Sequence, residues 1–156
     1  MSVSYLFPPN DNDVVVPDPP TKPKRNTKAI GDQSELEVAV ALARAGYIVS
    51  KPLGDSHRYD LIIDDGEKLS RVQVKTGRLT SGSVAVHCYS THAHRRGTMR
   101  TYRGEIEYLG VFCPQTGEVY LVPESDLVDS TMHLRVAPTV NRQDRHIRWA
   151  SRYKLA

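Results

Sequence analysis

Two stretches, Asp60-Leu-Ile-Ile63 and Arg71-Val-Gln-Val-Lys75, decide the interpretation of this chain. The first is an apolar run that opens with an acid. The second alternates valines with polar residues, so as a strand it would turn both polar side chains to one face. Between them, Asp64-Asp-Gly-Glu67 favours a tight turn and therefore a hairpin. Because paired strands lie about 5 Å apart, we expect the acid to lie close to the polar pair, Gln73 and Lys75.

Helical spacing of apolar residues precedes these strands. It predicts a helix over residues 29–46, with an apolar row of Leu36, Val40 and Ala43, widened by Ala39 and Leu42, and a stop at Gly46. Alternation and turn signals predict strands at residues 47–49, 61–63, 69–76, 83–87, 109–112 and 119–122. A short helix is expected near residues 124–128, and Trp149 and Tyr153 should pack on the body.

The residue types in this order suit phosphodiester hydrolysis. Asp60 offers a hard anionic oxygen for Mg²⁺, Gln73 a neutral amide oxygen, and Val74 a backbone carbonyl. Lys75 can orient the attacking water or offset charge on the phosphate. A glutamate of the preceding helix, Glu35 or Glu37, can complete the metal shell. Each of these residues alone is equally consistent with an ordinary surface position; only their combination indicates this chemistry.

Composition is that of a soluble globular protein with one domain. The 156 residues are 39% hydrophobic and 25% charged, and the net charge is +3. No apolar run reaches the roughly 20 residues of a membrane span, and the N-terminus lacks signal-peptide features, so we expect a cytoplasmic protein with no membrane partner. In that setting Cys88 and Cys113 are expected as reduced thiols. Residues 1–26, rich in proline, predict a disordered arm before a domain at 27–156.

Basic residues gather where the acids are missing. Between Arg71 and Gly104 the chain has seven Lys and Arg residues and no Asp or Glu. Such one-signed stretches attract polyanions. Five arginines are candidates for DNA contacts: Arg78, Arg95, Arg96, Arg100 and Arg103. The histidines and the cysteine of residues 87–94 lack the paired spacing of a zinc site and are interpreted as part of a basic loop.

The motifs together resemble the PD-(D/E)XK nuclease superfamily, and most of all its small endonucleases associated with group I introns. The segments that carry the likeness are Ile30-Gly-Asp-Gln-Ser-Glu35, Gly54-Asp-Ser-His-Arg-Tyr-Asp-Leu61, Arg71-Val-Gln-Val-Lys-Thr-Gly77, Tyr108–Phe112 with Val119–Pro123, and Ile147–Trp149. Within this pattern the helix acid falls on Glu35, the central acid on Asp60 and the lysine on Lys75. Gln73 replaces the second acid of the general pattern, as in the intron-associated branch.

The resemblance implies an α/β fold, with a restriction-endonuclease-like mixed central sheet flanked by helices. It implies Mg²⁺-dependent cleavage of double-stranded DNA, with Mn²⁺ as a substitute metal. A chain this small covers little DNA, so we expect a homo-oligomer, a dimer or a tetramer. Two alternatives stay open: a structure-selective nuclease such as a junction resolvase, and a DNA-binding protein in which Gln73 marks an inactive site.

Overall fold

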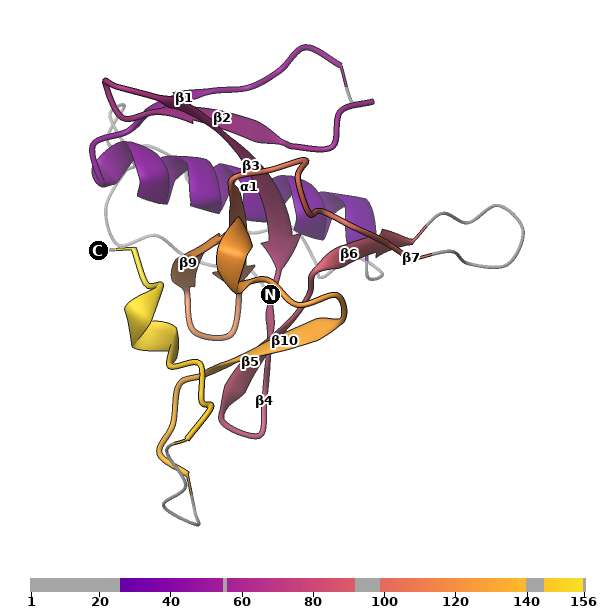
Figure 1. Cartoon of the computed structure of the whole chain (residues 1–156), viewed down its shortest axis with the longest axis vertical. Coiled ribbons are helices and arrows are strands. Elements are labelled where there is room, and N and C mark those ends of the chain that lie inside the picture. Colours follow the sequence, from indigo (N-terminus) through magenta and orange to yellow (C-terminus); the bar gives the residue numbers. More distant parts are fainter. Residues whose placement is uncertain (1–25, 55, 92–98, 140–144, 156) are drawn as a thin grey trace, which may run out of the picture.

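A computed structural model describes residues 26–54, 56–91, 99–139 and 145–155 (Figure 1). The predicted N-terminal arm up to residue 25 lies outside the described residues. The centre is a five-stranded sheet in the order β1-β2-β3-β8-β9. Its strands are β1 (Ile48–Ser50), β2 (Leu61–Asp64), β3 (Leu69–Thr76), β8 (Tyr108–Cys113) and β9 (Glu118–Pro123).

Pairing within this sheet is mixed. β1, β2 and β3 form an antiparallel meander, and β8 and β9 form a hairpin, while β3 and β8 run parallel. The crossover between β3 and β8 contains two strands of a second sheet and a projecting hairpin. The predicted mixed α/β architecture is therefore confirmed.

Helix α1 (Thr27–Arg44) covers one face of the central sheet, as Figure 1 shows. Its N-cap is Asn26, whose side chain accepts hydrogen bonds from the backbone amides of the first turn, an arrangement that satisfies otherwise unpaired donors. The helix buries Ser34, Val38 and Leu42. Val38 and Leu42 pack with valines, a leucine and an isoleucine of β2 and β3.

The predicted apolar row of Leu36, Val40 and Ala43 is wrong, whereas Leu42, which was expected to widen it, is buried. Leu36 is 68% exposed and Val40 44% exposed, whereas Val38 is fully buried. Apolar side chains occur on two sides of this helix, so spacing alone does not decide which side packs. Gly110 decides it: a Cβ there would lie 2.8 Å from a methyl group of Val38, so the missing side chain admits that face of α1 against β8.

The opposite face of the central sheet packs on a three-stranded sheet in the order β10-β5-β4. Its strands are β4 (Arg78–Thr80), β5 (Ser83–His87) and β10 (Thr131–Arg135). Of these, sequence analysis predicted only β5. Ser81 and Gly82 join β4 to β5, and both have positive φ, which matches the twist of a two-residue hairpin turn. Among the described residues α1 is the only α-helix, so this sheet covers the face where another helix was expected.

A two-stranded hairpin of β6 (Tyr89–Thr91) and β7 (Met99–Thr101) projects from the body (Figure 1). Residues 92–98, between the two strands, lie outside the described part. The short helix is present as a 3-10 turn, Glu124–Asp126, and a second 3-10 turn, Ala150–Arg152, follows Trp149. Tyr153 is buried, as expected, while Trp149 is half-buried. None of the helices among the described residues is long and apolar enough to cross a membrane.

Candidate active site

The pairing of strands β2 and β3 ends next to Asp60. Their pairing runs from Asp64 opposite Leu69 to Leu61 opposite Val72 and ends there. The amide of Asp60 still donates to the carbonyl of Val72, at 2.9 Å. Strand β3 continues to Thr76 with β8 as its partner on the other side. The next residues of β3 therefore have one backbone edge without a strand partner, and we call this place the fork.

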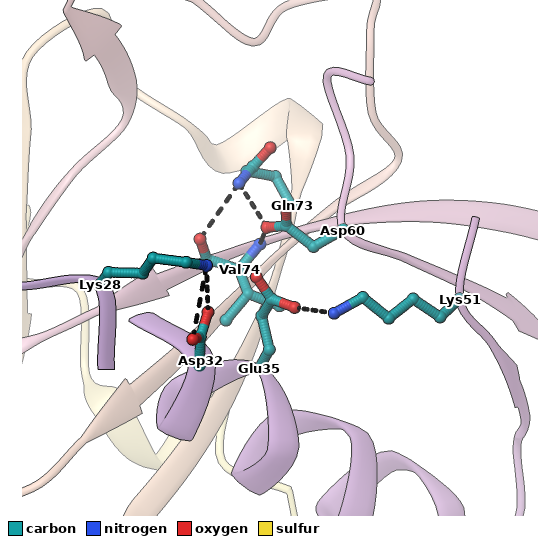
Figure 2. A network of polar contacts seen from close by, with 7 residues as sticks. All are labelled: Lys28, Asp32, Glu35, Lys51, Asp60, Gln73 and Val74. Carbon is teal, nitrogen blue, oxygen red and sulfur yellow. Dashed lines mark hydrogen bonds and ion pairs between the residues drawn. The ribbon is translucent and has the colours of Figure 1, made fainter. Parts of the chain in front are cut away.

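The carboxylate of Asp60 fills part of the fork. Its Oδ2 accepts the backbone amide of Val74 at 2.7 Å and the side-chain amide nitrogen of Gln73 at 2.5 Å. The same Gln73 nitrogen donates to the carbonyl oxygen of Val74 at 3.2 Å. Three oxygen-bearing groups that sequence analysis named as metal ligands therefore meet at one point, which an NH₂ group occupies (Figure 2). Turning the amide by about 180° would present its oxygen there instead.

Burial raises the pKa of the Asp60 carboxyl above its ordinary value. The hydrogen bond from Val74 opposes this rise, and the negative charge of Glu35 adds to it; Lys75 and Lys51 act in the lowering direction. The negative charge of a second carboxylate raises the pKa of a half-buried carboxylate further. A cation between the two carboxylates would stabilise both of their charged forms. The electrostatics of the fork therefore favour a bound metal ion.

Glu35 approaches from α1. In Figure 2 its carboxylate rises from the helix toward Asp60 and Val74. Its Oε2 accepts from Nζ of Lys51 at 2.5 Å, and this contact raises the pKa of Lys51. The Glu35 side chain is 24% exposed, while Glu37 lies on the exposed part of the helix. Of the two helix acids that the sequence left open, the structure brings Glu35 to the fork.

A hydrogen bond next to Glu35 joins α1 to β3. Ser34, next to Glu35, is 1% exposed, and its hydroxyl lies 2.6 Å from that of Thr76 at the end of β3. Ser34 also lies 2.9 Å from the carbonyl of Ile30 one turn earlier in α1. The contact ties the N-terminal half of the helix to the strand that carries Gln73 and Lys75. Sequence analysis missed this pair, because a serine and a threonine 42 positions apart give no local signal.

Lys75 lies on the face opposite α1. Val72 and Val74 alternate with it and pack against the helix. The ammonium of Lys75 lies 5.2 Å from the ring centre of Tyr102, and no salt bridge to Lys75 occurs within the described ranges. Glu35 thus reaches the fork from one face of the sheet, and Lys75 lies on the other. A reacting group in the fork would have an acid and a cation on its two sides.

Oxygen donors of this kind fit a hard divalent cation. They comprise two carboxylates, one side-chain amide and one backbone carbonyl. No group of three or more His, Cys, Asp or Glu side chains suited to a metal ion occurs in the described part of the chain, because Gln73 stands where a third acid would complete such a group. The donor set therefore fits a site for a divalent cation that carries few negative charges.

The five candidate DNA-binding arginines differ in their surroundings. Arg78 is exposed and begins β4, two residues after β3 ends. Arg100 pairs with Glu105, and Arg103 donates to Asp129 at 2.7 Å. Arg95 and Arg96 lie outside the described residues. Arg100 and Arg103 therefore form ion pairs within the chain, a role that their sequence context did not indicate.

The structure also shows where the cysteines and several of the histidines lie. Cys88 and Cys113 are free and buried, in agreement with the expected reduced thiols. His57 contacts the carbonyl of Leu53 at 3.1 Å, within its own loop. Of the histidines between residues 87 and 94, His87 contacts the hydroxyl of Thr131, and the other two lie outside the described residues.

Comparison with known proteins fits this geometry. The profile of the PD-(D/E)XK endonuclease family matches residues 25–156, so the chain belongs to that family of nucleases. Among solved structures, the chain is similar to a bacterial homing endonuclease, I-Ssp6803I, with a TM-score of 0.67 and 27% sequence identity. The match covers 83% of this chain and 89% of that one. No match was found among curated proteins. The resemblance inferred from the sequence is confirmed.

Proposed function

We propose that this protein is a metal-dependent endonuclease that hydrolyses phosphodiester bonds in double-stranded DNA. One observation carries the proposal. At the fork, the Asp60 carboxylate, the Gln73 amide and the Val74 carbonyl meet, with Glu35 on one side and Lys75 on the other. Membership of a nuclease family supports hydrolysis, and the homing endonuclease neighbour supports linear duplex DNA over branched DNA as substrate.

Mg²⁺ is the metal we propose, with Mn²⁺ as a substitute. The residues that would hold it are Asp60, Glu35, Gln73 through its amide oxygen, and Val74 through its carbonyl. When bound, the ion would withdraw charge from the phosphate and lower the pKa of a water ligand. With Gln73 in place of an acid, the site carries one negative charge fewer than the general pattern, so we expect weaker binding of a second cation.

The chain's own side chains complete the chemistry. The ammonium of Lys75 donates a hydrogen bond to a phosphate oxygen or to the attacking water, and so stabilises the charge that develops at phosphorus. The backbone amide of Val74 holds the Asp60 carboxylate in place, so this side chain needs no rearrangement during the reaction. Lys51 neutralises Glu35, which lets two carboxylates lie near each other before DNA arrives.

Assembly and setting follow from size and surface. One chain offers one such site, and cutting both strands of a duplex requires two. We therefore propose a homo-oligomer, a dimer or a tetramer, that acts in the cytoplasm as a site-specific, homing-type enzyme. Exposed apolar side chains on α1 and β1 support self-association: Leu36, Val40 and Ile48 are 68%, 44% and 66% exposed. Light scattering coupled to size exclusion measures the assembly.

Nicking of supercoiled plasmid tests the activity. The wild type should cut with Mg²⁺ or Mn²⁺ and stop on addition of EDTA. Asp60→Asn should abolish cutting, and Lys75→Met should slow it about 10²–10⁴-fold, while DNA binding survives in both. Glu35→Gln should abolish activity. Glu37→Gln, two residues further along the same helix, is the matched control. Wild-type protein that binds duplex DNA but never cuts it would support the inactive binding protein instead.

A further inference from the structure

Tyr102 is a buried aromatic residue that links the projecting hairpin to the site. It follows β7 directly and is only 3% exposed. Its ring belongs to the cluster under the central sheet, with Val111 and Ile106 among its members. Strand pairing places Lys75 opposite Val111, so the face of β3 that carries the lysine looks onto this cluster.

Two cations lie near this ring. The ammonium of Lys75 is 5.2 Å from the ring centre, and the guanidinium carbon of Arg58 is 4.5 Å from it. Both distances are within the range in which a cation is attracted by the electrons of an aromatic face. A lysine has four flexible methylene groups, so without a partner its ammonium samples many positions. An aromatic ring at this distance restricts them.

Arg58 clamps the base of the hairpin from the segment that leads to Asp60. Its guanidinium donates to Glu105 and to the hydroxyl of Ser90 in β6, both at 2.6 Å. It also donates to the carbonyl of Thr101 in β7 at 2.8 Å. The side chains of Arg58 and Glu105 are only 22% and 24% exposed, so this ion pair is shielded from solvent more than a surface pair is. One arginine therefore holds both strands of the hairpin.

We propose that Tyr102, held in place by Arg58, is a positioning residue that sets the ammonium of Lys75. The hairpin base and the fork then form one unit: Arg58 lies two residues before Asp60, and the ring it covers faces the lysine. The effect on cleavage rests on the proposed function, but the placement of Lys75 does not. The two are therefore tested separately.

Nuclear magnetic resonance on the metal-free protein tests the placement. Protons above an aromatic ring resonate upfield, so the Hε protons of Lys75, assigned by their loss in Lys75→Arg, should be shifted upfield in the wild type. They should stay upfield in Tyr102→Phe and return toward the ordinary lysine position in Tyr102→Leu. Tyr108→Leu, which changes a half-buried tyrosine in the other hydrophobic cluster, is the matched control and should leave them unchanged.

Single-turnover cleavage with saturating Mg²⁺ tests the consequence. Tyr102→Phe should cut at close to the wild-type rate, and Tyr102→Leu about tenfold more slowly, with unchanged affinity for DNA measured in Ca²⁺. If Tyr102→Leu does not fold, Arg58→Met takes its place, and the Lys75 resonance should again move downfield.

Equal Lys75 shifts in wild type and Tyr102→Leu, or in wild type and Arg58→Met, would overturn the proposal. So would a Phe variant that behaves like the Leu variant, because the effect would then come from the hydroxyl or from packing. A wild type that fails to cut DNA, but shows the upfield lysine, would refute the proposed function and leave the positioning intact.

Discussion

The side-chain amide of Gln73 donates to the carboxylate of Asp60 at 2.5 Å, across the point where β2 and β3 separate. The general superfamily pattern has an acid in place of this glutamine. In the protein without metal, a neutral donor holds Asp60 by a hydrogen bond where a second acid would repel it. A glutamine at this position therefore attracts a cation less strongly than an acid would, and it makes the metal-free protein more stable.

Gln73→Glu should make this difference visible. Without metal it should lower the free energy of unfolding by about 1–3 kcal/mol, because a hydrogen bond to a carboxylate is replaced by repulsion between like charges. Adding Mg²⁺ should raise its melting temperature more than that of the wild type. Thermal unfolding in EDTA and in Mg²⁺ measures both effects. Gln33→Glu, on the exposed part of α1, controls for added charge, and an equal response in both variants would contradict the metal assignment.

Asp60→Asn should stabilise the metal-free protein at neutral pH. Burial raises the pKa of Asp60 in the folded state, so the folded protein binds the proton more tightly than the unfolded chain does. Ionisation of Asp60 therefore costs stability above the folded pKa, and the cost vanishes as pH falls below the unfolded value of about 3.9. The gain of the Asn variant should shrink in the same direction. Urea unfolding at several pH values in EDTA measures it; a gain that does not depend on pH would be contrary evidence.

The contact between Ser34 and Thr76 should be worth most as a pair. Ser34→Ala or Thr76→Val alone leaves a polar partner in a largely buried place and should cost about 1–3 kcal/mol. The double variant should cost less than the sum, since both hydroxyl groups are then gone. A double-mutant cycle by urea unfolding gives the coupling energy. Strict additivity would mean that the hydroxyl groups do not interact.

Gly110→Ala should push α1 away from β8. The new Cβ would lie 2.8 Å from Val38, closer than real side chains approach, and 3.3 Å from Val72, which is a tight contact. Overpacking of this kind costs about 1–3 kcal/mol. Val38→Ala in the same chain should recover part of the loss, because it removes the methyl group that clashes. Thermal unfolding measures all three variants, and no recovery in the double variant would count against this packing.

Arg78 and Arg103 should separate DNA contact from internal structure. Arg78 is exposed at the start of β4, whereas Arg103 donates to Asp129 and to the carbonyl of Leu127. Arg78→Ala should reduce the slope of log affinity against log salt by about 1, the value for one lost phosphate contact. Arg103→Ala should reduce the slope of log affinity against log salt less than Arg78→Ala does. Fluorescence anisotropy on duplex DNA from 50 to 200 mM salt, about the range over which such slopes are measured, compares the two.

The alternating pattern of β3 and the turn before it are local properties, and they were enough to predict much of the site. Side chains alternate along any strand, so Gln73 and Lys75 had to share a face. A two-stranded hairpin brings its neighbour within reach, so Asp60 had to lie near them. The strands β4, β6, β7 and β10 were missed, because they are short and their pairing depends on partners far away in the chain.

The sequence by itself determined which residues could hold a metal and cut a phosphodiester, since residue type and a period of two are written into each strand. Only the tertiary structure decided how those residues meet. The end of β2 pairing at Leu61 opens the fork, and Gly110 admits the face of α1 that packs. With that face packed, Glu35 lies at the site and Glu37 is exposed. The same packing also brings in Lys51, which pairs with Glu35, and Tyr102, whose ring lies near Lys75 and Arg58. Contacts between residues tens of positions apart depend on shape and register, and neither is a property of any short stretch of chain.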